Sequence, residues 1–224
     1  QFCRQRPGAG MSENNASAAN VTGRKDLQLI CDLIPSESRV LDIGCGEGDL
    51  LDLLKLEKNI DGRGVEISQA GVNACVARGL SVVQGDADRD FKHFPDNGFD
   101  YAILSQTLQA TQRPDSVLKE LARIGKKLIV SFPNFANWRV RFYLMFKGRM
   151  PVTSTLYAQW YNTPNIHLCT IEDFIALCDE LDLKIEKSFI LSNDKIKHIE
   201  SSAGPLMNLI AEQALFVVSS HTEK

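Results

Sequence analysis

The stretch "VLDIGCGEGDL", residues 40–50, decides the fold, because a short apolar run leads directly into a glycine-rich turn and then a helix-like segment. Val40, Leu41 and Ile43 are typical of a buried strand. The three glycines that follow carry no side chain where the backbone must bend or a ligand must approach. In an open α/β sheet, such a turn lies at the carboxyl end of a strand, where ligands bind. The turn is therefore either a tight connection or a ligand-binding loop.

Outward from this turn, helix-like and strand-like segments alternate along the chain. The spacing of apolar residues predicts helices over 25–34, 49–56, 69–79, 113–125 and 171–181. Strands are predicted over 39–44, 62–68, 80–86, 99–105, 126–133, 184–190 and 214–220. This alternation predicts an α/β fold with a doubly wound, mostly parallel sheet and helices on both faces. The short link between the helix-like piece 205–213 and strand 214–220 predicts one antiparallel strand near the sheet edge.

Composition predicts one globular domain with a polar segment in front of it. Residues 1–24 are polar and lack apolar periodicity, so we expect a disordered N-terminal segment followed by a single domain over 25–224. Of the 224 residues, 44% are hydrophobic and 24% charged, and the net charge of −3 gives no attraction toward nucleic acid or anionic membrane.

Cysteine usage and hydropathy predict a cytoplasmic protein. The six cysteines form no C-x-x-C pair, which favours a reducing compartment. The sequence has no run of about 18 apolar residues, and its first ten residues lack the apolar core of a secretory signal. No metal site is predicted, because the four histidines are scattered and the cysteines lack ligand spacing. We therefore expect no membrane partner and no nucleic-acid partner.

The polar residues after three successive strands indicate a ligand that contains ribose. A dinucleotide loop requires glycine where Asp49 stands, and a phosphate loop requires a lysine that is missing. Asp42 precedes the glycines, and Glu66 ends the second strand about twenty residues on, where an acid can accept hydrogen bonds from a ribose diol. Asp86 follows the third strand and can accept from an exocyclic amine such as that of adenine.

These three strand-end motifs resemble the doubly wound, Rossmann-like family of S-adenosylmethionine-dependent methyltransferases. The resemblance implies S-adenosylmethionine as cofactor, with S-adenosylhomocysteine as its product form. It implies that the glycines back the amino-acid part of the cofactor, that Glu66 holds the ribose hydroxyls, and that Asp86 and the backbone at Ala87 meet the adenine. The loop "SQTLQA" would bring Gln106 and Leu108 near the sulfonium. The remaining cofactor-binding residues implied are Asp42, which orders the loop, and Gly44, Gly46 and Gly48.

Four sequence blocks carry a more specific resemblance: "VLDIGCGEGDLL", "SQTLQA", "SFPNFANWRVR" and "WYNTPNIHLCTIEDF". Over about residues 25–219, the chain resembles the MetW family of methionine biosynthesis proteins. The resemblance implies a role beside the homoserine O-acyltransferase, which such proteins support or regulate. Two hypotheses stay open: a regulatory subunit of that acyltransferase, or a methyltransferase acting on an unidentified small molecule. The residues do not decide whether the chain is an enzyme, because methyl transfer requires chiefly positioning of the acceptor.

Candidate catalytic residues are limited to histidines, since these titrate near neutral pH. Of His93, His167 and His198, only His167 lies in a loop that could close over the ligand crevice. It is either a base or a residue that orders this loop through a local hydrogen bond. Trp160 and Tyr161, in the same loop, either line an acceptor pocket or add aromatic area to the core.

Residues 137–150, "NWRVRFYLMFKGRM", combine aromatic and basic side chains at helical spacing. Four interpretations are open: a helix that packs in the core, a helix that covers the cofactor crevice, a helix that docks on a partner protein, and an interfacial membrane helix.

Overall fold

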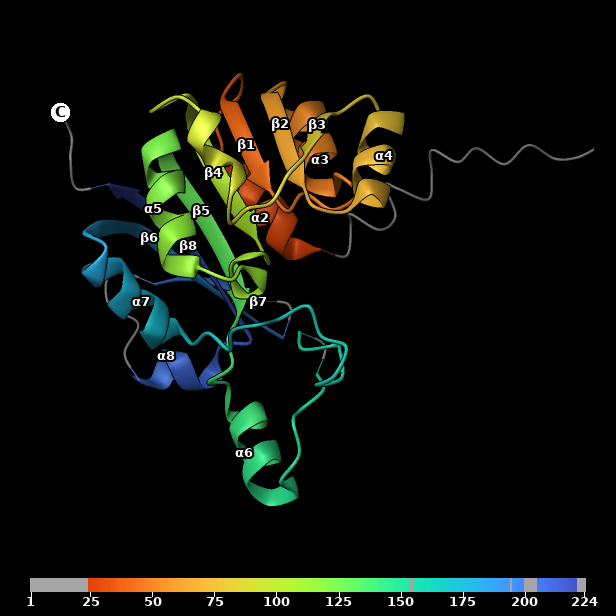
Figure 1. Ribbon diagram of the computed structural model, residues 1–224. Helices are drawn as coiled ribbons and strands as arrows, with labels where there is room; N and C mark the ends of the chain where they lie inside the picture. The colour runs from red at the N-terminus through yellow and green to blue at the C-terminus, as the bar shows by residue number, and fades with distance from the viewer. Residues whose placement is uncertain (1–23, 154, 194, 200–204, 221–224) are drawn as a thin grey trace, which may run out of the picture.

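The computed structural model describes residues 24–153, 155–193, 195–199 and 205–220. The disorder predicted for residues 1–24 falls outside the described residues, except at Arg24. The described strands form one eight-stranded sheet in the order β3-β2-β1-β4-β5-β8-β6-β7, with helices on both sides (Figure 1).

The strands are β1 (Arg39–Ile43), β2 (Asp61–Glu66), β3 (Ser81–Gln84), β4 (Phe99–Ser105), β5 (Gly125–Pro133), β6 (Leu183–Ser192), β7 (Lys195–Ile199) and β8 (Gln213–Ser220). The α-helices are α2 (Lys25–Leu33), α3 (Asp49–Lys58), α4 (Gln69–Ala77), α5 (Pro114–Ile124), α6 (Trp138–Lys147), α7 (Ile171–Glu180) and α8 (Pro205–Ile210). Two single-turn 3₁₀ helices are η1 (Asp90–His93) and η2 (Leu108–Ala110).

The predicted α/β, mostly parallel sheet is confirmed. Strands β1 to β5 are parallel, whereas β8 runs antiparallel between β5 and β6. The antiparallel strand therefore lies near the edge, as the short link from α8 predicts. A second antiparallel strand, β7, pairs with β6 at the edge and was not predicted. Its sequence, "KIKHI", is mostly exposed and carries two lysines, which is typical of an edge strand that avoids further pairing.

Side chains alternate along each strand, so the sheet buries two separate clusters. On one face, Leu41, Leu104 and Phe132 pack with α5 and α7. On the other face, Val40 and Ile103 pack with α2 and α3. This alternation places the side chain of each neighbouring strand residue on the opposite face. The two-sided burial explains why the central strands read as continuous apolar runs.

Local sequence features set the helix ends. Thr170 and Asp173 form a capping box at the start of α7, in which Thr170 Oγ1 accepts from the Asp173 amide at 3.2 Å. Helix α5 starts with Pro114 at its first turn, where a missing N–H costs nothing.

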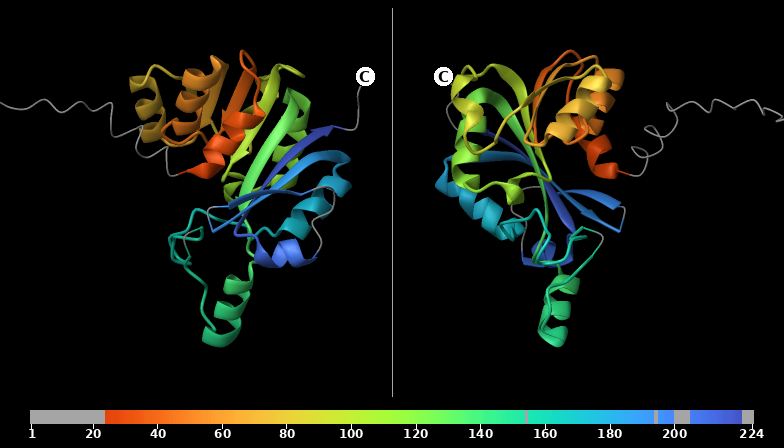
Figure 2. Two further views of the ribbon diagram at one scale, coloured as in Figure 1. Left: turned by 180° about the vertical axis from the view of Figure 1, so that it is seen from behind. Right: turned by 45° about the vertical axis from the view of Figure 1, so that its right-hand side comes forward.

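Helix α6 projects away from the sheet and its covering helices, as all views agree (Figures 1 and 2). Only Val140 on this helix is buried. The interpretations of 137–150 as a core helix or as a cover over the crevice are therefore wrong, because α6 packs on neither.

Candidate functional site

The site lies where the strand order reverses. The chain passes outward from β1 to β3 and returns to β4, so the carboxyl ends of β1 and β4 flank a crevice. A pocket of about 600 Å³ opens there, which is a normal size for a small-molecule site. Its lining includes Gly44 after β1 and Gln106 after β4, together with Arg24, Asp26, Gln109, Tyr157, Asn165 and Glu212.

The three predicted glycines differ in what surrounds them, although all have positive φ. A Cβ on Gly44 would lie 2.6 Å from a Thr107 methyl, and one on Gly48 would lie 2.4 Å from a Leu80 methyl. These two glycines are therefore required by packing as well as by backbone conformation. A Cβ on Gly46 would meet nothing within 4 Å. Gly46 is thus the glycine whose missing side chain leaves open space along the loop.

Glu66, at the end of β2, holds the glycine loop in place. Its two carboxylate oxygens accept hydrogen bonds from the backbone amides of Gly46 and Ser68, each at 2.8 Å. The side chain is buried. Because a carboxylate oxygen can accept more than one hydrogen bond, this arrangement leaves acceptor capacity for a ligand hydroxyl.

Asp42 is a buried carboxyl beneath the loop with an unpartnered oxygen. The residue is 2% exposed, and its Oδ1 has no hydrogen-bond partner. Burial raises the pKa of Asp42 to about 7, repulsion from Glu66 adds to the rise, and Arg24 opposes it. An orphaned polar atom beside a left-handed glycine loop is a feature expected of a ligand site rather than of a plain turn.

The raised pKa predicts that folding stability in the absence of ligand falls as pH rises. Folded Asp42 binds more protons than unfolded Asp42 between the usual pKa of 3.8 and about 7. Its contribution is therefore fully present below the unfolded pKa and lost as pH rises through the folded pKa. Asp42→Asn should remove this loss, of which about 3 kcal/mol falls between pH 4.5 and 8. Urea unfolding of both proteins from pH 4.5 to 8 measures it, and parallel curves would contradict the raised pKa.

Asp86 and Ala87 follow β3 at the same edge of the sheet. Asp86 Oδ1 accepts from the Asp88 amide at 2.9 Å, and Asp86 Oδ2 lies 3.6 Å from Arg89 Nε. Ala87 is partly buried against the core. Neither residue lines the 600 Å³ pocket, and neither do Glu66 and Asp42. The structure therefore places the predicted residues in two groups, one in the pocket and one along the adjoining strand ends.

Gln106 lines the pocket in a left-handed backbone conformation, with φ of 57°. Its Nε2 is buried without a partner, and so is Oε1 of Gln109 in the next turn. A hydrogen bond orients the side-chain amide of Gln109, because its Nε2 donates to the Gln106 carbonyl at 2.7 Å. Two residues that line one pocket thus hold a buried unpaired donor and a buried unpaired acceptor. Leu108, by contrast, is buried in the core and is not among the lining residues.

The loop between β5 and α7 closes one side of this pocket. The Ile166 and His167 amides both donate to the Gln109 carbonyl, at 2.8 and 3.0 Å, which fixes the loop over η2. The His167 ring lies 3.4 Å from the Gln112 carbonyl, outside the pocket lining. This contact fits the interpretation of His167 as a residue that orders the loop.

Trp160 and Tyr161 belong to neither the pocket nor the core. They are 73% and 70% exposed, so the interpretation as core aromatic residues is wrong. Neither residue lines the 600 Å³ pocket. The pocket instead takes Tyr157 from this loop. The sequence gives no signal that separates Tyr157 from the other two aromatic residues, because all lie in a segment without regular periodicity.

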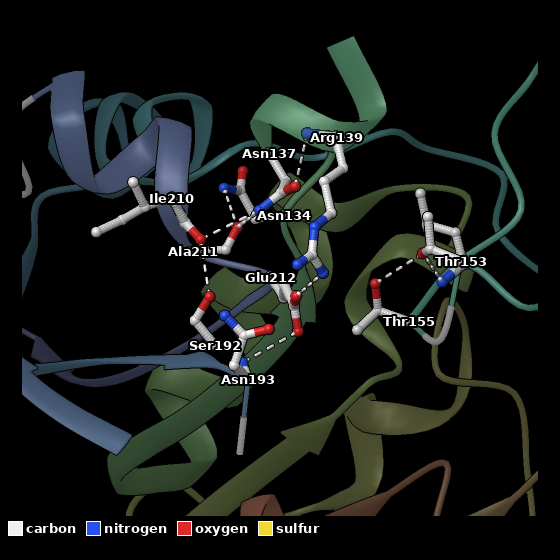
Figure 3. Close-up of polar contacts among 11 residues, drawn as sticks. Asn134, Asn137, Arg139, Thr153, Thr155, Ser192, Asn193, Ile210, Ala211 and Glu212 are labelled. Atoms are coloured by element: carbon white, nitrogen blue, oxygen red, sulfur yellow. Dashed lines mark hydrogen bonds and ion pairs between the residues drawn. The ribbon is translucent and has the colours of Figure 1, made fainter. Parts of the chain in front are cut away.

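Two asparagines that sequence analysis did not single out join α6 to the end of α8 (Figure 3). Asn134 Nδ2 and Asn137 Nδ2 each donate to two carbonyl oxygens, at 2.7 to 3.1 Å, and the acceptors belong to Asn208, Ile210 and Ala211. These carbonyls lie at the end of a helix, where intrahelical donors are missing. The Ile210 carbonyl also accepts from Ser192 Oγ at 2.8 Å. Both asparagines lie in the sequence block "SFPNFANW", which is the feature of the sequence that could have pointed to them.

Glu212 connects this junction to the pocket. Its Oε1 accepts from Arg139 Nη1 at 2.9 Å, and its Oε2 accepts from the Asn193 amide at 3.4 Å (Figure 3). Because Glu212 also lines the 600 Å³ pocket, the first turn of α6 and the pocket share one side chain.

The described part of the chain holds neither a cluster of metal-binding side chains nor a membrane-spanning helix. No group of three or more His, Cys, Asp or Glu side chains there could hold a metal ion. No helix among these residues is long and apolar enough to cross a membrane. The five cysteines that the structure describes are free thiols.

The family described as methionine biosynthesis protein MetW matches residues 24–218. This chain belongs to the MetW family. A MetW relative, the bifunctional methionine biosynthesis protein MetXA/MetW of Rhodopirellula baltica, is 34% identical over 217 residues. The match covers 93% of this chain and 34% of the relative, so the chain spans about a third of that relative's length. A demethylmenaquinone methyltransferase of Geobacillus kaustophilus is 30% identical over 55% of the chain and 58% of its own length.

Solved structures show the fold of this MetW-family chain. An S-adenosylmethionine-dependent methyltransferase of Thermotoga maritima superposes with a TM-score of 0.62 at 21% identity, covering 87% of this chain and 86% of the other. One of Archaeoglobus fulgidus gives 0.63 at 19% identity, covering 88% and 93%. The sheet and its helices are thus those of S-adenosylmethionine-dependent methyltransferases.

Proposed function

We propose that the chain binds S-adenosylmethionine along the ends of β1, β2 and β3. The observation that carries this is the orphaned Oδ1 of buried Asp42 beneath a loop in which only Gly46 faces open space. Glu66 would hold the ribose hydroxyls, and Asp86 with the Ala87 backbone would meet the adenine. Gly44, Gly48 and Gln106 would complete the site. When bound, the cofactor supplies an activated methyl group on its sulfonium.

We further propose that the chain supports or regulates a homoserine O-acyltransferase in the cytoplasm. The support comes from the Rhodopirellula relative, whose name joins MetXA and MetW in one polypeptide of which this chain covers about a third. Fusion into one polypeptide gives two proteins a high effective concentration for each other, which favours their interaction. The cofactor would then act as an effector that reports the supply of methionine products.

A second function, methyl transfer to a small molecule, is favoured by one observation. The 600 Å³ pocket adjoins the glycine loop and is lined by Gln106 and Gln109, whose Nε2 and Oε1 are buried without partners. A methyl acceptor with both an acceptor and a donor would satisfy these two atoms.

The cofactor proposal predicts micromolar binding. Calorimetric titration with S-adenosylmethionine, then with S-adenosylhomocysteine, is expected to give a Kd near 1 μM, about −8 kcal/mol. The same titration of Glu66→Gln should give at least about tenfold weaker binding, because an amide keeps only one acceptor oxygen. An absence of heat with both ligands would contradict the proposal.

The acyltransferase proposal predicts coupled effects. Adding the chain to the purified homoserine O-acyltransferase of the same organism should raise its activity, and the cofactor should change their mutual affinity. Because coupling is reciprocal, the acyltransferase must change the affinity for S-adenosylmethionine by the same factor. Unchanged acyltransferase activity would contradict the supporting role. Equal cofactor affinity with and without the acyltransferase would contradict the effector role alone.

A further inference from the structure

Helix α6 carries a concentration of exposed apolar side chains. Trp138 and the five consecutive residues 142–146, "FYLMF", are each 41% to 71% exposed. The rings of Trp138, Phe142 and Phe146 contact one another in sequence along the helix, with centroids 6.1 and 5.6 Å apart. Contiguous exposed apolar area of this kind marks an interaction site.

The segment 134–171, which contains α6, has a net charge opposite in sign to that of the rest of the chain. Residues 134–171 contain four cations, Arg139, Arg141, Lys147 and Arg149, and no aspartate or glutamate, which gives +4. The whole chain is −3, so the remaining residues carry −7. Two α6 helices from two copies would repel each other through these cations. The complementary surface is therefore apolar with acidic residues around it.

The distribution of apolar side chains favours a protein groove over a membrane surface. Residues 142–146 go round more than one full turn, since a helix has 3.6 residues per turn. An interfacial membrane helix has one apolar face and one polar face. A helix that is apolar on several sides is instead one that is covered by protein.

The base of α6 is held rigidly, so the helix is presented in a fixed direction. Asn137 Oδ1 caps it by accepting from the Arg139 amide at 2.9 Å, and the Arg141 guanidinium donates to the Ala136 carbonyl at 2.6 Å. Val140 is buried, whereas the aromatic residues of this helix are exposed. The helix itself projects away from the body (Figure 2). A preorganised helix loses little conformational freedom on binding.

We propose that α6 is the docking element for the homoserine O-acyltransferase, inserted into an apolar groove with a carboxylate rim on that protein. This inference rests on the proposed supporting function. Phe142, Met145 and Phe146 fill the groove, and Lys147 and Arg149 meet the acidic rim. Arg139 on α6 pairs with Glu212, which lines the 600 Å³ pocket. Docking at α6 therefore acts on a side chain of that pocket.

The test compares binding of the purified acyltransferase of the same organism to three variants. Phe142→Ala/Phe146→Ala removes the exposed rings, and Lys147→Glu/Arg149→Glu reverses the charge. Leu56→Ala, on α3, is the matched control, because Leu56 is 79% exposed and lies outside α6. Both α6 variants should bind at least about 30-fold more weakly, the loss typical of central aromatic residues, and the control should bind like the wild type. Cofactor titration verifies that each variant is folded.

The outcomes separate this inference from the function on which it rests. Binding by wild type and equal binding by both α6 variants would overturn the docking site and leave the supporting function intact. No binding by wild type would overturn both. Vesicles of phosphatidylglycerol and sedimentation of the chain alone complete the experiment. Vesicle binding or self-association that the α6 variants lose, without effect on the acyltransferase, would assign α6 to a membrane or to a second copy instead.

Discussion

Replacing Gly46 with valine is expected to weaken S-adenosylmethionine binding at least about 100-fold while the protein stays folded. A Cβ at this position meets no protein atom within 4 Å, so we expect the branched side chain to fill open volume along the loop. Its φ of 57° makes the change cost about 2 kcal/mol of stability, because this backbone conformation suits glycine. Calorimetry with the cofactor and urea unfolding measure the two effects separately.

Gly48→Ala is the matched control within the same loop. Its new methyl would lie 2.4 Å from Leu80 and 2.9 Å from the Cys75 sulfur, so the core under the loop must shift. We expect this variant to lose more stability than Gly46→Val, although its side chain is smaller. Unchanged cofactor affinity in Gly46→Val would show that the open side of the loop does not face the cofactor.

Removing the Asn134 side chain is expected to destabilise the protein by about 3 kcal/mol. Asn134→Ala leaves the buried Asn208 carbonyl without its side-chain donor and the Ala211 carbonyl with Asn137 Nδ2 alone. It also frees the Ala136 amide, which donates to Asn134 Oδ1 at 3.1 Å. Each unpaired buried group costs about 1 to 3 kcal/mol. The loss should appear in urea unfolding as a lower midpoint with an unchanged slope.

Asn73→Ala provides the comparison for this effect. Asn73 lies on the exposed surface of α4 and accepts only from Gln69 Nε2 at 3.0 Å. Its replacement should change stability by less than about 0.5 kcal/mol. Equal midpoints for the two variants would mean that the Asn134 hydrogen bonds contribute nothing net. Because Asn134 also precedes α6, we expect its variant to weaken acyltransferase docking even below its unfolding transition.

Much of the fold could be predicted because the local spacing of apolar residues defines its strands and helices. The strands β1, β4 and β5 read as apolar runs, and the strand-to-helix turn carries its glycines at fixed offsets. Strand β7 could not be found this way, because it lies at the solvent-exposed edge of the sheet and its lysines interrupt the apolar pattern. Trp160 and Tyr161 also could not be placed, because burial of an aromatic residue in a long loop depends on contacts remote in sequence.

The sequence by itself determined the α/β architecture, the family and the glycine loop flanked by Asp42, Glu66 and Asp86. Only the tertiary structure decided which glycine faces open space, that Asp42 is buried with an orphaned oxygen, and that α6 stands apart from the core. The physical reason is that the spacing of apolar residues defines one face of a helix or strand. Which element packs on that face depends on segments far away in the chain. Helix α6 has the pattern of a packed helix, yet no described element of its own chain covers it.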